Sequence, residues 1–82
     1  VEKIHRVVGG QVEALEFTAL EGAPYLGIPL SRLHIEKGVL VAVLVRDKTV
    51  IIPFGSDHIE AGDTVILMAQ TSKIMGLEDA LK

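Results

Sequence analysis

The sequence predicts an α+β domain, a two-layer sandwich in which a small, mostly antiparallel sheet of four strands packs against two short helices. Three observations support this prediction: an apolar, strand-forming run at residues 39–45, a second apolar segment, T-V-I-L-M-A, at 64–69, and apolar residues at helical spacing near the C-terminus. With 82 residues, the chain is expected to be one domain spanning residues 1–82. Since it starts at Val1 and not at methionine, we expect it to be a fragment of a longer protein.

The most clearly defined element is a predicted β-hairpin over residues 39–53. Its apolar run is followed by R-D-K-T and then by V-I-I-P, whose proline cannot donate to a β-ladder. A two-residue turn at Asp47–Lys48 would give three cross-strand pairs: Val45 with Val50, Leu44 with Ile51, and Val43 with Ile52. Alternation along the first strand would turn its side chains to two faces: Val39, Val41, Val43 and Val45 on one, and Leu40, Ala42 and Leu44 on the other.

Both faces of this strand are therefore apolar, whereas an antiparallel sheet usually leaves one face to water. Two short helices are enough to cover one face of a sheet of this size. We expect a second copy of the chain, related by a two-fold axis, to cover the other face. The sequence thus predicts a homodimer that forms through the second apolar face of the sheet.

The segments before the hairpin are less regular. Residues 1–8 mix apolar and charged positions and are predicted to form a strand, which Gly9–Gly10 ends. Residues 11–20 fit a helix by their Glu, Ala and Leu content, and a strand by the alternation of Leu15, Phe17 and Ala19. Local pattern alone leaves both structures open for this segment.

Two short helices complete the prediction. Pro29 is expected to open the first, at about residues 30–36, which would bury Leu30 and Leu33. Thr71 or Ser72 would cap the second, at about residues 72–81. Its apolar stripe would consist of residues at i, i+3 and i+7: Ile74, Leu77 and Leu81.

Composition excludes several classes of partner. The net charge is −3 and the eight basic residues are scattered, so no basic stripe is available to neutralise nucleic-acid phosphates. The absence of cysteine excludes disulfides and fits a reducing compartment. The longest apolar run, residues 39–45, is far short of the roughly 20 residues that span a bilayer. We therefore expect a soluble domain that does not bind nucleic acid.

Catalytic and metal-binding patterns are weak. The three histidines, His5, His34 and His58, are too far apart to form a recognisable ligand motif. The best metal candidate is a loop that contains Asp57, His58, Glu60 and Asp63, but Asp57 and Asp63 are better explained as turn and cap residues. The serines lack a G-x-S-x-G motif, and no cysteine is present. We predict no metal site and no catalytic residue, so the domain is not expected to be an enzyme.

The best ligand-binding candidates are positively charged side chains near the predicted hairpin turn. Arg46 and Lys48, together with Arg32, could contact an anionic ligand held at the dimer seam. We include His58 because of its charge and position, so the candidate set is Arg46, Lys48 and His58. The alternative is that these are solvated turn residues that keep an exposed hairpin tip soluble.

The order of several short segments resembles a known family. These segments are H-R-V-V-G-G-Q-V-E-A-L-E at 5–16, Gly27 followed by Leu30 and Leu33, V-L-V-R at 43–46, V-I-I-P at 50–53, and I-E-A-G-D-T-V at 59–65. Together with the terminal helix through Leu81 they resemble the C-terminal domain of regulator-of-potassium-conductance proteins (TrkA-C or RCK-C). The variant that they resemble is that of the Trk-type potassium-uptake regulatory subunit. One departure is Asp47, where family members often have glycine.

The resemblance implies more than the residues show by themselves. It implies that residues 11–19 form a strand, and that the domain pairs about a two-fold axis. It also implies a separate Rossmann-type domain that binds NAD(H) or ATP. The G-x-G-x-x-G fingerprint of such a domain is missing here, so we expect no cofactor in this chain. The implied membrane partner is a Trk-type potassium transporter, and some relatives bind a cyclic dinucleotide effector.

These observations lead to one main functional hypothesis. The chain is expected to be a non-enzymatic regulatory and dimerisation module of a cytoplasmic potassium-uptake subunit, held at the inner face of the membrane by its transporter. A nucleotide or cyclic dinucleotide effector is a possible ligand. The alternative is a small-molecule-sensing regulatory domain fused to a metabolic enzyme.

Overall fold

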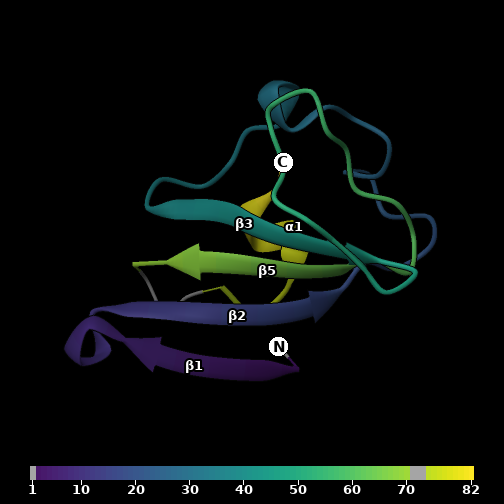
Figure 1. Ribbon diagram of the computed structural model, residues 1–82. Coiled ribbons are helices and arrows are strands. Elements are labelled where there is room, and N and C mark those ends of the chain that lie inside the picture. The colour runs from purple at the N-terminus through teal and green to yellow at the C-terminus, as the bar shows by residue number, and fades with distance from the viewer. Residues whose placement is uncertain (1, 71–73) are drawn as a thin grey trace.

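The computed structural model describes residues 2–70 and 74–82. Five antiparallel strands form one sheet in the order β1-β2-β5-β3-β4. Figure 1 labels the first four of them in this order. Their bounds are Lys3–Val7 (β1), Val12–Thr18 (β2), Val39–Arg46 (β3), Thr49–Ile51 (β4) and Thr64–Ala69 (β5). The predicted α+β class and antiparallel sheet are confirmed, but the sheet has five strands and not four.

The ambiguous segment 11–20 accounts for this difference. Its central part is β2, which pairs with β1 on one side and with β5 on the other. Leu15 and Phe17 are buried on one face of β2, as the alternating pattern predicts. Helix propensity is overridden here because pairing on both sides satisfies the backbone of β2 and buries its apolar face. The strand implied by the family resemblance is confirmed.

The predicted hairpin forms with the predicted turn. Val45 pairs with Val50 and Leu44 with Ile51, and both Asp47 and Lys48 have positive φ angles, 49° and 68°. Two consecutive positive φ values are typical of a type I′ turn, whose twist matches that of the strands. The third predicted pair, Val43 with Ile52, is absent because β4 ends at Ile51.

The simple alternation predicted for residues 39–45 is wrong. The register between β3 and β5 shifts between Val41 and Val43, which lie opposite Leu67 and Ile66. This bulge places an extra residue, Ala42, in β3, so Val41 and Leu44 both point to the buried face. The two residues were expected on opposite faces.

The first predicted helix, at about residues 30–36, is also wrong in length. It is a single 3-10 turn, Leu30–Arg32 (η2), which follows Pro29. Leu30 is buried and Leu33 partly buried. After Leu33 the chain is extended, because His34 exchanges backbone hydrogen bonds with Lys82, at 2.7 and 3.0 Å. The backbone after Leu33 therefore pairs with the C-terminal segment and does not continue the helix.

The C-terminal helix is shorter than the predicted 72–81. It spans Leu77–Ala80 (α1), and its N-cap, Gly76, is extended. Asp79 Oδ2 accepts hydrogen bonds from the backbone N–H groups of Met75 and Gly76. The predicted caps, Thr71 and Ser72, lie outside the described residues. The predicted apolar stripe is nevertheless buried: Ile74, Leu77 and Leu81.

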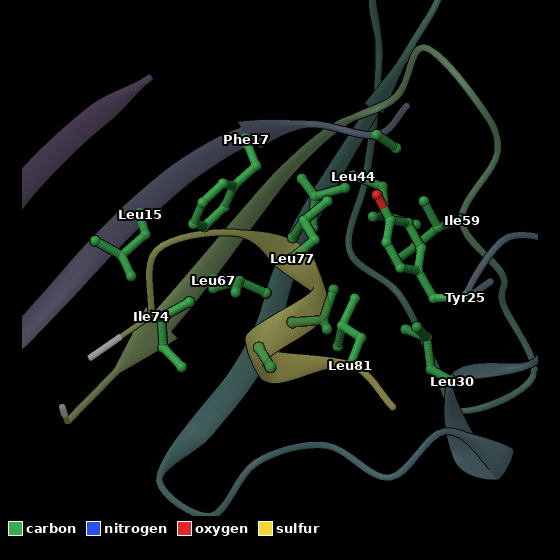
Figure 2. Packing of buried hydrophobic residues seen from close by; sticks show 14 of the residues in the cluster. Leu15, Phe17, Tyr25, Leu30, Leu44, Ile59, Leu67, Ile74, Leu77 and Leu81 are labelled. Carbon is green, nitrogen blue, oxygen red and sulfur yellow. The ribbon is translucent and has the colours of Figure 1, made fainter. Parts of the chain in front are cut away.

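The core lies between one face of the sheet and a layer made by α1 and the segments that connect the strands. Leu77 and Leu81 pack in this layer near Leu67 and Leu44 of the sheet (Figure 2). A short 3-10 turn, Val8–Gly10 (η1), joins β1 to β2, where the glycine pair was expected to end the first strand. No helix in the described ranges is long and apolar enough to cross a membrane.

Candidate functional site

A cluster of charged side chains lies where β3 ends and β5 begins. Arg46 is the last residue of β3, and Asp63 immediately precedes β5. The guanidinium group binds the carboxylate through two hydrogen bonds, Nε to Oδ1 at 2.9 Å and Nη2 to Oδ2 at 2.8 Å. Only 1% of the Asp63 side chain is exposed, against 27% of Arg46. The pair therefore joins a buried anion to a partly exposed cation.

Local sequence explains the position of Asp63. Its carboxylate accepts a hydrogen bond from the Glu60 N–H at 2.9 Å, and its own N–H donates to the Glu60 carbonyl at 3.0 Å. Gly62 supplies the positive φ angle, 88°, that this turn requires. The sequence prediction that Asp63 stabilises the turn before β5 is confirmed, but its pairing with Arg46 was not predicted.

The other donors of Arg46 are also occupied. Nη2 donates to the His58 carbonyl at 2.9 Å, and Nη1 lies 2.9 Å from Glu60 Oε2. The same Glu60 oxygen lies 3.1 Å from His58 Nε2. Arg46, His58, Glu60 and Asp63 thus form one connected group, which we call the tip cluster.

The electrostatics of the tip cluster follow from this geometry. Burial by itself would raise the pKa of Asp63, but the hydrogen bonds from Arg46 and from the Glu60 N–H, with the nearby positive charge, outweigh it and lower this pKa. The hydrogen bond to Asp63 raises the pKa of Arg46. The pair is therefore held in its ionised form.

The structure brings together two of the three predicted ligand-binding residues. Arg46 and His58 meet in the tip cluster, whereas Lys48 lies exposed at the hairpin turn and forms no ion pair within the described ranges. Every nitrogen of the Arg46 side chain already contacts an oxygen of the chain. An anionic ligand would have to displace Glu60 to reach Arg46, while it could reach Lys48 directly.

The prediction that Asp57 is a turn residue is confirmed. Its Oδ2 accepts a hydrogen bond from the Phe54 N–H at 2.7 Å. The best metal candidate in the sequence consisted of Asp57, His58, Glu60 and Asp63. These four residues belong to two separate local structures: Asp57 to its own turn, and the other three to the tip cluster.

A second feature is the sheet face opposite the core, which we call the outer face. The strand register places Ala14, Leu40 and Met68 next to one another there, and likewise Val43 with Ile66 and Val45 with Val50. These side chains are half-buried or exposed. A shallow hollow of about 300 Å³ includes Val12, Leu40 and Met68 in its lining. The described residues thus leave one apolar face of the sheet without a covering layer.

An open antiparallel sheet, covered on one face and apolar on the other within the described residues, defines a small α+β domain. The family model of the TrkA-C domain matches residues 14–82. The chain belongs to the TrkA-C domain family, and the family resemblance noted from the sequence is confirmed.

Similar proteins agree with this family. The chain is 35% identical over all its 82 residues to "Trk system potassium uptake protein TrkA homolog 2" of Methanosarcina mazei. It is 30% identical, again over its full length, to "Trk system potassium uptake protein TrkA homolog 1" of the same organism and to "Trk system potassium uptake protein TrkA" of Azorhizobium caulinodans. The chain spans only 18% of the length of each of these relatives.

Proposed function

We propose that this chain is a regulatory and pairing domain of a Trk-type potassium-uptake protein, and that it controls potassium transport through a membrane transporter without catalysing a reaction. The observation that carries the proposal is the similarity of the whole chain to potassium-uptake proteins, at 30–35% identity. The proposed site of action is the inner face of the membrane, where a cytoplasmic regulator can contact its transporter.

The outer face is the proposed pairing surface. Its apolar side chains lie on neighbouring strands, so burial against a second copy removes a continuous apolar area from water. An effector that binds one arrangement of the dimer more tightly than another shifts the population toward that arrangement. The resulting rotation of one copy against the other would pass to the rest of the protein.

An anionic effector, such as a nucleotide or cyclic dinucleotide, is proposed to bind near the hairpin tip. Lys48 and His58 would make the first contacts, because both are exposed or partly exposed, and Arg46 would contribute after release from Glu60. NAD(H) or ATP is assigned to a separate Rossmann-type domain, and no cofactor to this chain.

Potassium uptake in cells tests the proposed function. A full-length protein that contains this domain should restore potassium-limited growth to cells without their own Trk regulator. The variant Ala14→Lys, which puts a charge on the outer face, should abolish this rescue while leaving the protein level unchanged. The matched control is Leu20→Lys, at an exposed apolar position (63%) outside the sheet. Equal rescue by both variants would refute the role of the outer face.

Ligand binding is tested separately by thermal shift of the 82-residue chain. Cyclic di-AMP and ATP serve as probes, because a ligand that binds the folded state raises the melting temperature by mass action. The shift should be lost in the variant Lys48→Gln/His58→Gln and kept in Lys37→Gln, at an exposed lysine outside the tip cluster. The absence of any shift with either probe would remove effector binding from the proposal.

A further inference from the structure

A hollow on the core side of the sheet has no part in the proposed function. It lies where the end of β2 meets the segment that leads into α1, and its volume is about 240 Å³. The residues that line it include Phe17, Tyr25 and Leu77, which Figure 2 shows in the core. These three side chains are buried, so they give the hollow an apolar floor that is held in place by the packing of the core.

Two carboxylates line the same hollow. Glu2 precedes β1, and Glu78 lies in the first turn of α1. Both residues are exposed, and neither belongs to an ion pair within residues 2–70 and 74–82. Among the described residues, none of those that line the hollow is basic. The hollow therefore combines an apolar floor with two negative charges that no side chain of the described structure neutralises.

Two observations place the Glu78 carboxylate at the hollow. A Cβ atom at Gly76, another lining residue, would lie 2.7 Å from Glu78 Oε2, so the carboxylate rests over this glycine. Burial raises the pKa of Tyr25, and the negative charge of Glu78 raises it further. The carboxylate thus lies close to both Gly76 and Tyr25, on two sides of the hollow.

The cations of the neighbouring strand β1 are already paired. Lys3 lies 3.9 Å from a carboxylate oxygen of Glu16, and Arg6 lies 3.3 Å from one of Glu13. The whole chain has a net charge of −3. A cationic group of another molecule would therefore meet an attractive field at this hollow.

The size and the lining of the hollow together identify its occupant. A volume of about 240 Å³ is below the roughly 300–1,000 Å³ of small-molecule sites, so the hollow fits one side chain and not a nucleotide. Long cationic side chains bury their aliphatic stems along apolar surface and keep their charged ends at a polar edge. Arginine suits two carboxylates better than lysine does, because its planar group carries five donors and is less strongly hydrated.

We propose that this hollow is a docking site for an arginine side chain of a partner protein. The stem of the arginine packs on Phe17, Tyr25 and Leu77, and its guanidinium group pairs with Glu2 and Glu78. Complementary charge selects this partner over an uncharged or acidic one. The inference goes beyond the proposed function and does not depend on it, since neither the outer face nor the tip cluster contributes to the hollow.

An NMR titration of the 82-residue chain with capped amino acids tests the proposal. The probe is N-acetyl-arginine amide, and the matched probe is N-acetyl-citrulline amide, which has a similar shape but no charge. The arginine probe should shift the backbone amide signals of Thr18, Gly76 and Leu77, which line the hollow. A Kd of about 1–10 mM is expected for a probe of this size. The citrulline probe should bind about five- to tenfold more weakly, because it cannot form the two exposed ion pairs.

Variants of the chain test the two carboxylates. Glu2→Gln/Glu78→Gln should weaken binding of the arginine probe about five- to tenfold. The matched control is Glu36→Gln/Asp47→Asn, which changes the net charge equally at exposed positions away from the hollow and should weaken binding at most about twofold. Gly76→Ala keeps the net charge but displaces the Glu78 carboxylate, so it should also weaken binding; its backbone, with a φ of −154°, accepts alanine.

The outcomes of these titrations decide the proposal. Equal Kd values for the arginine and citrulline probes, or equal effects of the two double variants, would overturn it. The absence of shifts at Thr18, Gly76 and Leu77 when the arginine probe is at about five times the expected Kd would also overturn it. Equal binding of N-acetyl-lysine amide would overturn the choice of arginine and leave a site for a cationic side chain.

Discussion

Replacing Arg46 by methionine tests whether the tip cluster holds β3 to the turn before β5. Methionine keeps much of the aliphatic length of arginine but removes the guanidinium group. The variant loses two hydrogen bonds to Asp63, one to the His58 carbonyl and the contact with Glu60. Asp63, which is 1% exposed, would keep its charge with only the Glu60 N–H as a partner in the described structure.

The cost can be estimated from the burial of the two partners. Removal of one member of a fully buried ion pair costs about 3–5 kcal/mol. Arg46 is 27% exposed, so water can enter the vacated space and the estimate is reduced to about 2–4 kcal/mol. A chain of this length has a free energy of unfolding of about 4–12 kcal/mol. The variant is therefore expected to lose a large fraction of its stability and to melt roughly 10 to 25 °C lower.

Urea denaturation followed by circular dichroism at neutral pH measures this change. The matched control is Arg32→Met, the same substitution at an exposed arginine with no ion pair in the described ranges, for which a change within about 0.5 kcal/mol is expected. A double-mutant cycle with Asp63→Asn isolates the coupling between the two side chains. A loss below about 1 kcal/mol for Arg46→Met, or no coupling, would show that the cluster contributes little to the fold.

Three further predictions concern pH, the turn and the core. Folding lowers the pKa of Asp63 below its ordinary value of 3.8. The ionised Asp63 carboxylate therefore stabilises the fold fully above pH 3.8, and this stabilisation is lost as the pH falls through the lower pKa of the folded state. Urea titrations from pH 5 to 2 should therefore show a steeper loss for the natural chain than for Asp63→Asn, and parallel curves would contradict this. Lys48→Gly should stabilise the chain by about 0.5–1 kcal/mol, because Lys48 has a φ of 68° in a turn that favours glycine; a clear loss of stability would contradict the assigned turn. Leu67→Ala, in the buried part of β5, should cost about 3–5 kcal/mol in the same denaturation assay, against less than about 0.5 kcal/mol for Leu20→Ala; similar losses in both would contradict the described core.

The hairpin was predictable because its information is local. An apolar run, a polar break of fixed length and a proline place the turn, and a two-residue turn sets the register of Val45 with Val50. The bulge at Ala42 was not predictable in this way. It arises where β3 must match β5, a strand more than 20 residues later in the chain.

Helix lengths were predicted poorly for a related reason. Periodicity correctly identified Ile74, Leu77 and Leu81 as core residues, but the same spacing does not require a helix of ten residues. The bridge between Ile35 and Leu81 extends both segments and shortens both helices. Such pairing is a long-range contact, so the helix propensity of either segment cannot predict it.

Only part of the tip cluster could be predicted from local sequence. Asp57 and Asp63 were identified as turn residues from local sequence, and both accept backbone hydrogen bonds. The pairing of Asp63 with Arg46 spans 17 residues and had no signal in a single sequence. Charge and position selected Arg46 and His58, but only the fold brings them to one glutamate.

The amino-acid sequence by itself determined the class of the domain, the central hairpin, the buried apolar positions and the family. These depend on composition, alternation and short motifs, which act over a few residues. The tertiary structure alone decided the bulge, the short helices and the ion pair of Arg46, and it settled the strand identity of residues 12–18, which local pattern left open and only the family resemblance implied. Each of these results from competition between local preference and a distant partner, and burial or hydrogen bonding with that partner supplies the larger free energy.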